Sequence, residues 1–310
     1  MAEADLEPQY RGRRVLVTGA SGFIGARLCR RLEALGAEVV ATSRTPIAAG
    51  ASITWRPCDL SDASATQALI DRTRPERLFH LASHVVGTRA TSAVPPTVAA
   101  NLLSTVNLLM AAQQCGCQRV VLTGSLEEPD PGPAWPVPSS PYAAAKMAAN
   151  AYGRMFHALF GLPVVILRVF MVYGPGQRDH AKLVPYVITS LLKGEMPRLG
   201  SGLRDIDWVF VDDVVDAFVR AGVAPKAIGA TIDVGSGELV TVRRVVELLF
   251  EMLRPGEAPV FGDIGDRALE QIRVAQVDAT DELTGWRPTV VLRDGLRRTI
   301  DFYRGSPGSG

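Results

Sequence analysis

A glycine-rich turn between an apolar strand and a helix is the feature that most constrains how this chain can fold. Gly19, Gly22 and Gly25 follow the β-branched run RVLVT and open a helical pattern over Phe23–Leu35. Missing side chains let the backbone approach a pyrophosphate closely, and a helix N-terminus presents free N–H groups and the positive end of its dipole. A tight turn that binds nothing is the alternative, because the spacing G-x-x-G-x-x-G differs from the more general G-x-G-x-x-G. The strand–turn–helix context favours a dinucleotide site.

Apolar strands alternate with amphipathic helices through the first half of the chain. We predict strands in RRVLVTGA, EVVATSR, ITWRPCDL, RLFHLAS, QRVVLTGS and PVVILRVF, with helices between them that include Val98–Cys115 and Tyr142–Phe160. Strands this apolar are covered on both faces, as in a parallel sheet. The expected fold class is therefore α/β, a Rossmann-type doubly wound parallel sheet with a smaller C-terminal α/β substrate subdomain.

After Tyr173 the chain becomes richer in Gly, Pro and polar residues, and GPGQRDH and GEMPRLGSGLRD are predicted loops. A strand running into a helix is predicted in WVFVDDVVDAFVRAG, a strand in ATIDVGSG, and amphipathic helices in TVRRVVELLFEML and LRDGLRRTIDFYR. We expect the dinucleotide-binding domain over 10–174 plus a crossing segment of about 206–245. The substrate subdomain is expected over 175–205 and 246–305.

Composition excludes several classes of protein. The 310 residues carry a net charge of +1, which gives no broad attraction to nucleic acid or to an anionic membrane. The start of the chain has no apolar core and no run reaches about 18 apolar residues, so we expect a cytoplasmic protein without signal peptide or membrane span. The four cysteines lack C-x-x-C spacing and the four histidines are scattered, so we expect reduced thiols and no metal site.

The end of the second predicted strand bears on the choice of dinucleotide. An acidic residue there would accept the adenosine ribose hydroxyls of NAD, whereas an arginine accommodates the 2′-phosphate of NADP. The chain has Ser43–Arg44 and no acid at this point, and a guanidinium forms a charge-assisted fork with phosphate. We therefore expect NADP(H), with a surface arginine that tolerates either cofactor as the alternative. Asp59 can accept a hydrogen bond from the adenine amino group, unless it only caps a loop or a helix.

Tyr142 and Lys146 are four residues apart in PYAAAKMAAN and would face the same way on a helix. An ammonium beside a phenol stabilises the phenolate, so we expect Lys146 to lower the pKa of Tyr142 from its ordinary value of about 10. The tyrosine could then exchange a proton near neutral pH. Ser125 ends the fifth predicted strand, where the carboxyl ends of parallel strands face the ligand crevice. With a dinucleotide site, this combination predicts hydride chemistry at an alcohol or ketone carbon.

With these residues in register, the chain resembles the extended short-chain dehydrogenase/reductase family, whose members act on nucleotide-activated sugars. The resemblance extends from VTGASGFIG through RVFMVYGPGQ and RDIDWVFVDDVVDA to ELTGWRP. It implies a catalytic triad of Ser125, Tyr142 and Lys146, in which Tyr142 exchanges the proton and Lys146 bonds the nicotinamide ribose. The expected cofactor-binding residues are Gly19, Ser21, Gly22, Phe23, Ile24, Gly25, Ser43, Arg44, Asp59, Leu60, Leu81, Ala82, Ser83 and Asn101, together with Tyr142 and Lys146.

The resemblance also implies a nucleoside-diphosphate sugar held by arginines. Arg204, in GLRD, is expected to bind the diphosphate, and a second arginine is expected at Arg267, with Arg273 as the alternative because the spacing is about one residue off the usual pattern. A diphosphate needs cationic forks, although each arginine could instead be a solvated surface charge. The other expected substrate-binding residues are His84, Ser125, Glu127 and Met171.

Two departures from the family pattern concern the substrate. Met171 stands where Asn is usual in RVFMVYGPGQ, and SLEEPD replaces the common S-x-x-x-Y-G. A 4,6-dehydratase needs an acid and a base beside the catalytic hydroxyl; here Leu126 cannot donate a proton, although Glu127 falls at the position of the base. The 4-epimerases commonly hold NAD tightly and carry the acid after strand two that this chain lacks. The run G-S-x-E-E is similar to that of reductases of GDP-4-keto-6-deoxymannose.

We therefore expect an NADPH-dependent reductase of the C4 ketone of a nucleoside-diphosphate 4-keto-6-deoxyhexose, an activity of deoxysugar biosynthesis. The alternatives are a 4-epimerase or 4,6-dehydratase that uses bound NAD(P) catalytically, and a non-catalytic NADP-sensing protein, a class that tends to lose the Tyr or the Lys. A homodimer is expected through the helices that carry Asn101 and Tyr142. The nucleotide base and the configuration of the product stay open.

Overall fold

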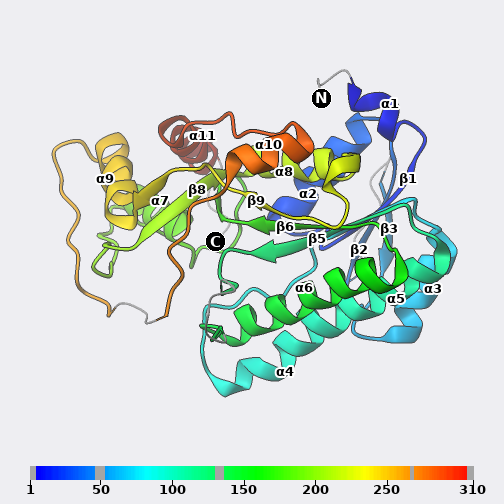
Figure 1. Cartoon of the computed structure of the whole chain (residues 1–310). Coiled ribbons are helices and arrows are strands. Elements are labelled where there is room, and N and C mark those ends of the chain that lie inside the picture. Colours follow the sequence, from blue (N-terminus) through cyan, green and yellow to red (C-terminus); the bar gives the residue numbers. More distant parts are fainter. Residues whose placement is uncertain (1–4, 46–52, 130–135, 266–268, 306–310) are drawn as a thin grey trace.

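The computed structural model describes residues 5–45, 53–129, 136–265 and 269–305. Figure 1 shows a large sheet between two layers of helices, with a smaller group of strands and helices at one side.

The large sheet has seven parallel strands in the order β3-β2-β1-β4-β5-β6-β9. They are β1 (Arg14–Thr18), β2 (Glu38–Ser43), β3 (Thr54–Pro57), β4 (Arg77–His80), β5 (Arg119–Ser125), β6 (Val164–Val169) and β9 (Thr231–Val234). The order reverses between β1 and β4, and ligands of open parallel sheets bind at the carboxyl ends of the strands beside such a reversal. The predicted Rossmann-type fold class is confirmed.

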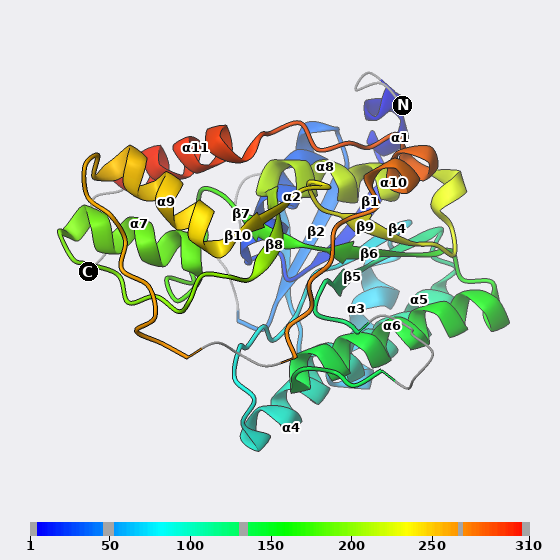
Figure 2. The same cartoon turned by 60° about the vertical axis from the view of Figure 1, so that its left-hand side comes forward.

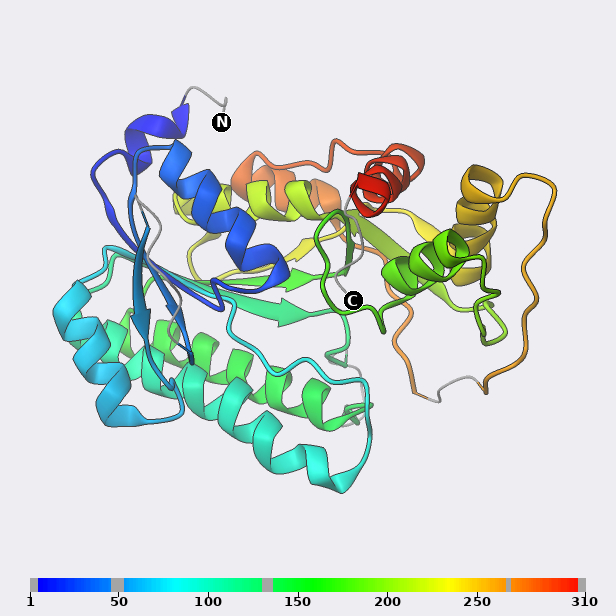
Figure 3. The same ribbon diagram turned by 180° about the vertical axis from the view of Figure 1, so that it is seen from behind.

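Helices cover both faces of this sheet, which explains why its central strands are largely apolar and buried. On one face lie α3 (Ala63–Thr73), α5 (Ser104–Cys115) and α6 (Pro141–Phe160); on the other lie α2 (Phe23–Ala34), α8 (Val211–Ala221) and α10 (Val277–Thr284) (Figures 1 and 3). Val15 and Val17 belong to one buried cluster and Leu16, between them, to the other. Alternate residues of one strand therefore enter two separate cores.

The helix α6 owes its position to signals in the sequence at both ends. Ser140 precedes it and its Oγ accepts from Ala143 N at 3.1 Å, while Pro141 occupies the first turn. Gly161 ends the helix with φ +69°, a left-handed conformation that glycine adopts without strain. These caps fix the helical phase of Tyr142 and Lys146.

The predicted helix Val98–Cys115 is part of a longer helical run with a widened turn. The run comprises η2 (Thr91–Ala93), α4 (Val94–Thr97), the π-helical η3 (Val98–Leu103) and α5. Ser104 Oγ donates to Ala100 O at 2.6 Å and Thr105 Oγ1 to Asn101 O at 2.7 Å, so hydroxyls bond carbonyls at the point where the helical register changes. Thr91–Cys115 is long and apolar enough to cross a membrane, yet here it packs against α3 and α6 as a helix of the fold.

The smaller part is built on a three-stranded sheet in the order β10-β8-β7. Its strands are β7 (Met171–Tyr173), β8 (Asp205–Phe210) and β10 (Leu239–Thr241), and α7 (Leu183–Lys193), α9 (Val242–Leu253) and α11 (Leu292–Gly305) pack with it (Figure 2). The sequence analysis did not identify β7, β10, α7 or α10. It also did not identify α1 (Glu7–Tyr10) or the short η4 (Pro225–Ala227).

Two buried carboxylates connect the smaller part to the rest of the chain. Asp207 on β8 accepts from Ser236 N, Ser236 Oγ, Gly237 N and Ala275 N at 2.5–3.0 Å. Asp213 on α8 accepts from the backbone N–H groups of Thr289 and Val290. The crossing segment expected over 206–245 is thus shared, since β8 and β10 belong to the small sheet and β9 to the large one. The domain boundaries themselves stay a prediction.

Candidate active site

The glycine turn after β1 has the geometry of a cradle that side chains would fill. Gly19 has φ +65°, and a Cβ on it would lie 2.6 Å from Ala82 N and from Leu81 C. A Cβ on Gly25 would lie 2.2 Å from Gly19 O. Gly22 is the N-cap of α2, and no side chain in the described part of the chain caps that first turn. The first N–H groups of α2 therefore point outward with the positive end of the helix dipole, an arrangement that fits a dinucleotide pyrophosphate.

The end of β2 lies where an adenosine ribose is expected. Arg44 is exposed, and Ser43 Oγ donates to the backbone oxygen of Thr45 at 2.6 Å. Asp59 is exposed and accepts from Ser61 Oγ and Ser61 N; these hydrogen bonds, with a smaller effect of Arg44, lower the pKa of its carboxyl. One Asp59 oxygen is thus engaged in its own loop, as the capping alternative anticipated. The cofactor roles of these residues stay predictions.

The segment after β4 is held against the glycine turn by Asn101. The Asn101 side chain is buried; its Oδ1 accepts from Ser83 Oγ at 3.1 Å and His84 N at 2.6 Å, and its Nδ2 donates to His84 O at 3.2 Å. Asn101 thus makes three hydrogen bonds to the segment that follows β4, and its role in the cofactor site stays a prediction. Leu81 and Ala82, in the same segment, lie against Gly19.

His80 is a buried residue of this region that the sequence analysis missed. Burial, with the charge of Lys146, lowers the pKa of its imidazole to about 3, so the ring is neutral. Thr105 Oγ1 gives its proton to Asn101 O, so His80 Nε2 donates to Thr105 at 3.0 Å and Nδ1 accepts from Thr18 Oγ1 at 2.7 Å. His80 thereby links β1, β4 and α5, and the only signal in the sequence was a histidine inside an apolar strand.

Ser125, Tyr142 and Lys146 are brought together at the carboxyl end of β5. The hydroxyl of Tyr142 is within hydrogen-bonding reach of Ser125 and Ser83. Lys146 is buried, its Nζ donates to Thr123 O at 2.8 Å, and it lies 6.0 Å from the centre of the Tyr142 ring. A phenol and a hydroxyl that lie close together in one site can both bond the oxygen of a carbonyl or an alcohol.

The expected lowering of the Tyr142 pKa is wrong for this structure. Burial raises the pKa of Tyr142 to about 12; the hydrogen bond with Ser125 lowers it, and the carboxylates of Glu128 and Glu127 raise it. The ammonium of Lys146 is directed to a backbone carbonyl and not to the phenol oxygen, and burial lowers its own pKa to about 8. Loss of hydration therefore outweighs the attraction that the sequence argument relied on.

Two arginines predicted to hold a diphosphate are described, and both contact the turn after β5. Arg204 Nη2 lies 3.1 Å from Glu127 Oε1 and Arg204 Nη1 lies 3.2 Å from Glu270 Oε1, with the arginine side chain 17% exposed. Arg273 Nη2 donates to Glu128 O at 3.2 Å. Arg267 lies outside the described residues. Arg204 thus contacts Glu127, the residue after Leu126, although the two are 77 residues apart along the chain.

The other residues of the turn after β5 divide between core and site. Leu126 is buried in the apolar core that includes α2 and α8, so its side chain does not enter the site. Glu128 was not predicted; its Oε1 accepts from Ser125 N and from Asn150 Nδ2, both at 2.7 Å. The sequence feature that could have indicated this contact is Asn150. It lies eight residues after Tyr142 and four after Lys146, on the same face of α6. Met171 is part of β7 and pairs with Trp208.

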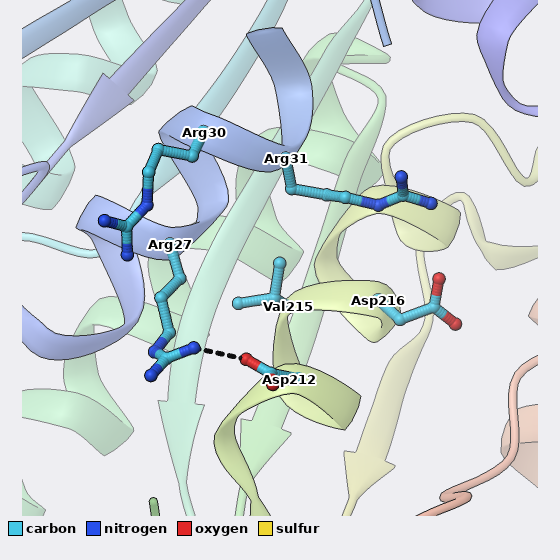
Figure 4. Close-up of a pocket in the computed structure, with 6 residues that line it drawn as sticks. All are labelled: Arg27, Arg30, Arg31, Asp212, Val215 and Asp216. Atoms are coloured by element: carbon cyan, nitrogen blue, oxygen red, sulfur yellow. Dashed lines mark hydrogen bonds and ion pairs between the residues drawn. The ribbon is translucent and has the colours of Figure 1, made fainter. Parts of the chain in front are cut away.

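A surface pocket of about 360 Å³ lies elsewhere, between α2 and α8. It is lined by Arg27, Arg30, Arg31, Asp212, Val215 and Asp216 (Figure 4). Arg27 Nη1 lies 2.6 Å from Asp212 Oδ1 and Nη2 donates to Pro175 O, so the arginine ties the two helices together. None of the triad residues lines this pocket, and it is not the candidate active site.

The cysteines are free thiols, and within the described ranges no cluster of three or more His, Cys, Asp or Glu is placed to hold a metal ion.

Known proteins resemble this chain over nearly its whole length. Residues 15–235 match the NAD dependent epimerase/dehydratase family. A UDP-glucose 4-epimerase of Mycolicibacterium smegmatis is 34% identical, over 94% of this chain and 98% of its own. A dTDP-glucose 4,6-dehydratase of Haemophilus influenzae is 28% identical, over 93% and 97%. The structure of a Thermus thermophilus UDP-glucose 4-epimerase in complex with NAD superposes with a TM-score of 0.82 at 30% identity, over 95% of this chain and all of that one. The chain therefore belongs to the NAD-dependent epimerase/dehydratase family of extended short-chain dehydrogenases/reductases.

Proposed function

We propose that this enzyme reduces the C4 ketone of a nucleoside-diphosphate 4-keto-6-deoxyhexose with NADPH. The observation that carries the proposal is the phenol of Tyr142, which lies beside Ser125 in the site and whose pKa is raised by burial to about 12. A phenol that keeps its proton at neutral pH is ready to donate it to a developing alkoxide, which is the proton transfer that reduction requires.

NADPH supplies the hydride when it is bound. Ser125 donates a hydrogen bond to the ketone oxygen and orients the carbonyl, and Tyr142 gives its proton to the same oxygen as the negative charge develops there. Lys146, held by Thr123 O, places a positive charge behind the phenol and compensates for the loss of its proton. Ketone, hydride and one proton together give the alcohol.

Arg44 and Ser43 support NADP(H) as the cofactor. They end β2, at the place where an acid would select the unphosphorylated ribose, and Arg44 is exposed and available to a 2′-phosphate. The matching family is described as NAD dependent and the Thermus thermophilus epimerase structure is a complex with NAD, so the proposal of NADP(H) rests on Ser43 and Arg44 and not on the relatives.

Arg204 supports a diphosphate substrate. It is partly buried beside the turn that follows Ser125, and its guanidinium bonds two carboxylates, those of Glu127 and Glu270. A guanidinium that bonds anionic oxygens through both of its Nη atoms can bond phosphate oxygens in the same way when these displace the carboxylates. Arg267 is proposed to add a second cation.

A 4-epimerase is the second candidate function, favoured by the 34% identity with a UDP-glucose 4-epimerase over almost the whole of both chains. An epimerase would return the hydride to the opposite face of the same C4 ketone and consume no cofactor. Dehydration is disfavoured because Leu126, at the position of the acid, is in the core. A non-catalytic sensor is disfavoured because Tyr142 and Lys146 are both present in the site.

One experiment separates these functions. The enzyme is mixed with NADPH and TDP- or GDP-4-keto-6-deoxyhexose, and the loss of reduced-nicotinamide absorbance is followed alongside chromatography of the sugar nucleotide. Stoichiometric oxidation of NADPH supports the reductase. In parallel, UDP-glucose and UDP-galactose are incubated without added cofactor; their interconversion, with no NADPH consumed by any ketosugar, would establish the epimerase instead.

We also propose a homodimer formed through the α5–α6 face. Large apolar side chains are exposed on these helices, including Met110 on α5 and Tyr152, Leu159 and Phe160 on α6. Sedimentation of the purified protein at the mass of one 33.2 kDa chain would contradict it.

A further inference from the structure

We propose that Glu128 is a positioning residue of the active site, which fixes Ser125 and supplies the anion that faces Lys146. The inference rests on the proposed function, because it gives Glu128 its importance through those two residues. It goes beyond that function in assigning a residue outside the triad, in the turn where this chain departs from the usual family pattern.

The end of β4 creates the need for such a residue. β4 ends at His80, which pairs with Leu122, so β5 continues to Ser125 beyond its neighbour. Backbone groups on that open edge need partners from side chains. Thr123 O accepts from Lys146 Nζ at 2.8 Å, and Ser125 N donates to Glu128 Oε1 at 2.7 Å. A cation and an anion thus occupy neighbouring positions where the next strand is missing.

The carboxylate of Glu128 is held from the other side by α6. Its Oε1 also accepts from Asn150 Nδ2 at 2.7 Å, one turn of the helix beyond Lys146. Gly124 leaves the necessary space: a Cβ there would lie 2.8 Å from Asn150 Nδ2 and 2.9 Å from Glu128 Oε1. Side chains on β5 and α6 are therefore arranged around this one oxygen, and Ser125 is fixed relative to the helix that carries Tyr142.

The turn itself adds further constraints. Glu128 N donates to Ser125 O at 3.1 Å, and Glu127 N donates to Ser125 Oγ at 3.2 Å. The charged and titratable groups around Glu128 come from several elements: Tyr142 and Lys146 on α6, Glu127 on the same turn, and Arg273 from the segment before α10. His80 on β4 is influenced by the charge of Lys146. Among the groups that act on the charge of Lys146, Glu128 is the anion that stabilises it.

The substitution Glu128→Gln separates charge from geometry. The glutamine carbonyl can accept from both Ser125 N and Asn150 Nδ2, as the carboxylate oxygen does, but carries no charge. The charge of Glu128 raises the pKa of Lys146. We therefore expect this pKa to fall by about one unit when that charge is removed. The alkaline limb of the turnover profile should move to lower pH by the same amount. Glu195→Gln, which removes an exposed carboxylate, is the matched control and should leave both unchanged.

The chain makes the titration of Lys146 directly measurable. It has only four lysines, Lys146, Lys182, Lys193 and Lys226, so a protein labelled with ¹³C at lysine Cε gives four signals, and the signal absent from Lys146→Arg identifies Lys146. This readout needs no substrate. An unchanged Lys146 titration in Glu128→Gln would overturn the inference.

Kinetics test the positioning part. Glu128→Leu removes charge and hydrogen bonds together, and its turnover should fall at least tenfold below that of Glu128→Gln at each variant's own optimal pH. Equal turnover of the two variants would overturn the positioning role. If the Lys146 titration shifts but the wild-type enzyme reduces no ketosugar nucleotide, the proposed function fails while the electrostatic effect of Glu128 on Lys146 stands.

Discussion

Replacing Gly25 by alanine tests the geometry of the dinucleotide cradle. The added Cβ would lie 2.2 Å from Gly19 O, 2.9 Å from Gly19 C and 3.0 Å from the Cα of Ala20. A carbon and a carbonyl oxygen normally stay at least about 3.3 Å apart, so the turn and α2 must separate by about 1 Å. All three neighbours are backbone atoms, so no side chain can rotate away.

Two effects of opposite sign contribute to the stability of this variant. Alanine in place of glycine favours a helix by about 1 kcal/mol, whereas overpacking costs about 1–3 kcal/mol. Because the obstruction is backbone on every side, we expect the cost at the upper end of that range and a net loss of about 2 kcal/mol. Thermal unfolding should therefore begin several degrees lower than in the wild type.

Dinucleotide affinity should fall more clearly than stability. A shift of about 1 Å misaligns the N–H groups at the start of α2 with the pyrophosphate, and hydrogen bonds to a charged group contribute about 1.5–3 kcal/mol each. Losing one of them corresponds to a 10- to 100-fold weaker Kd, measured by calorimetry with NADP⁺ and with NAD⁺. Gly265→Ala, at a position where a Cβ meets nothing within 4 Å, is the control. A Gly25→Ala protein with wild-type melting temperature and wild-type Kd would refute this account of the cradle.

Four further perturbations have definite expected outcomes. Tyr142→Phe should lower turnover by about 10²–10⁴-fold and leave the NADP⁺ Kd unchanged in a fluorescence titration; turnover close to wild type would exclude the acid role. Arg44→Ala should weaken NADP⁺ about 10- to 100-fold and leave NAD⁺ binding unchanged, and an equal loss for both would contradict a 2′-phosphate contact. Glu127→Gln removes one carboxylate that competes for Arg204, so calorimetry should show several-fold tighter binding of UDP, TDP or GDP, and an unchanged Kd for all three would argue against competition. Asp207→Ala removes the acceptor of four hydrogen bonds and should lower the free energy of unfolding by about 3 kcal/mol in urea titrations; a loss below about 1 kcal/mol would show that the freed donors find other partners.

Local signals in the sequence were sufficient where one element carries the whole feature. The strand–glycine–helix motif around Gly19 depends on neighbours a few residues apart, and so does the helix that Ser140 and Gly161 cap. Tyr142 and Lys146 lie on one face of α6 for the same reason. The helix α7 was missed because its residues, LVPYVITSLLK, lie between loops rich in Gly and Pro and include a proline in the first turn.

Electrostatics could not be predicted from local spacing. Lys146 is one turn from Tyr142, yet its ammonium bonds Thr123 O, and the phenol's pKa rises instead of falling. Burial and the placement of Glu128 decide that direction, and neither can be read from the distance of four residues between a tyrosine and a lysine.

The sequence by itself determined the fold class, the cradle for a dinucleotide and the helix face that bears the reactive side chains, because each follows from residues that are close along the chain. Only the tertiary structure decided which charges meet. Arg204 bonds Glu127 although the two are 77 residues apart along the chain. Glu128, in the turn after β5, accepts a hydrogen bond from Asn150 on α6. His80 is neutral because three elements enclose it. Such contacts depend on how elements pack and how far water is excluded, and these are properties of the assembled fold.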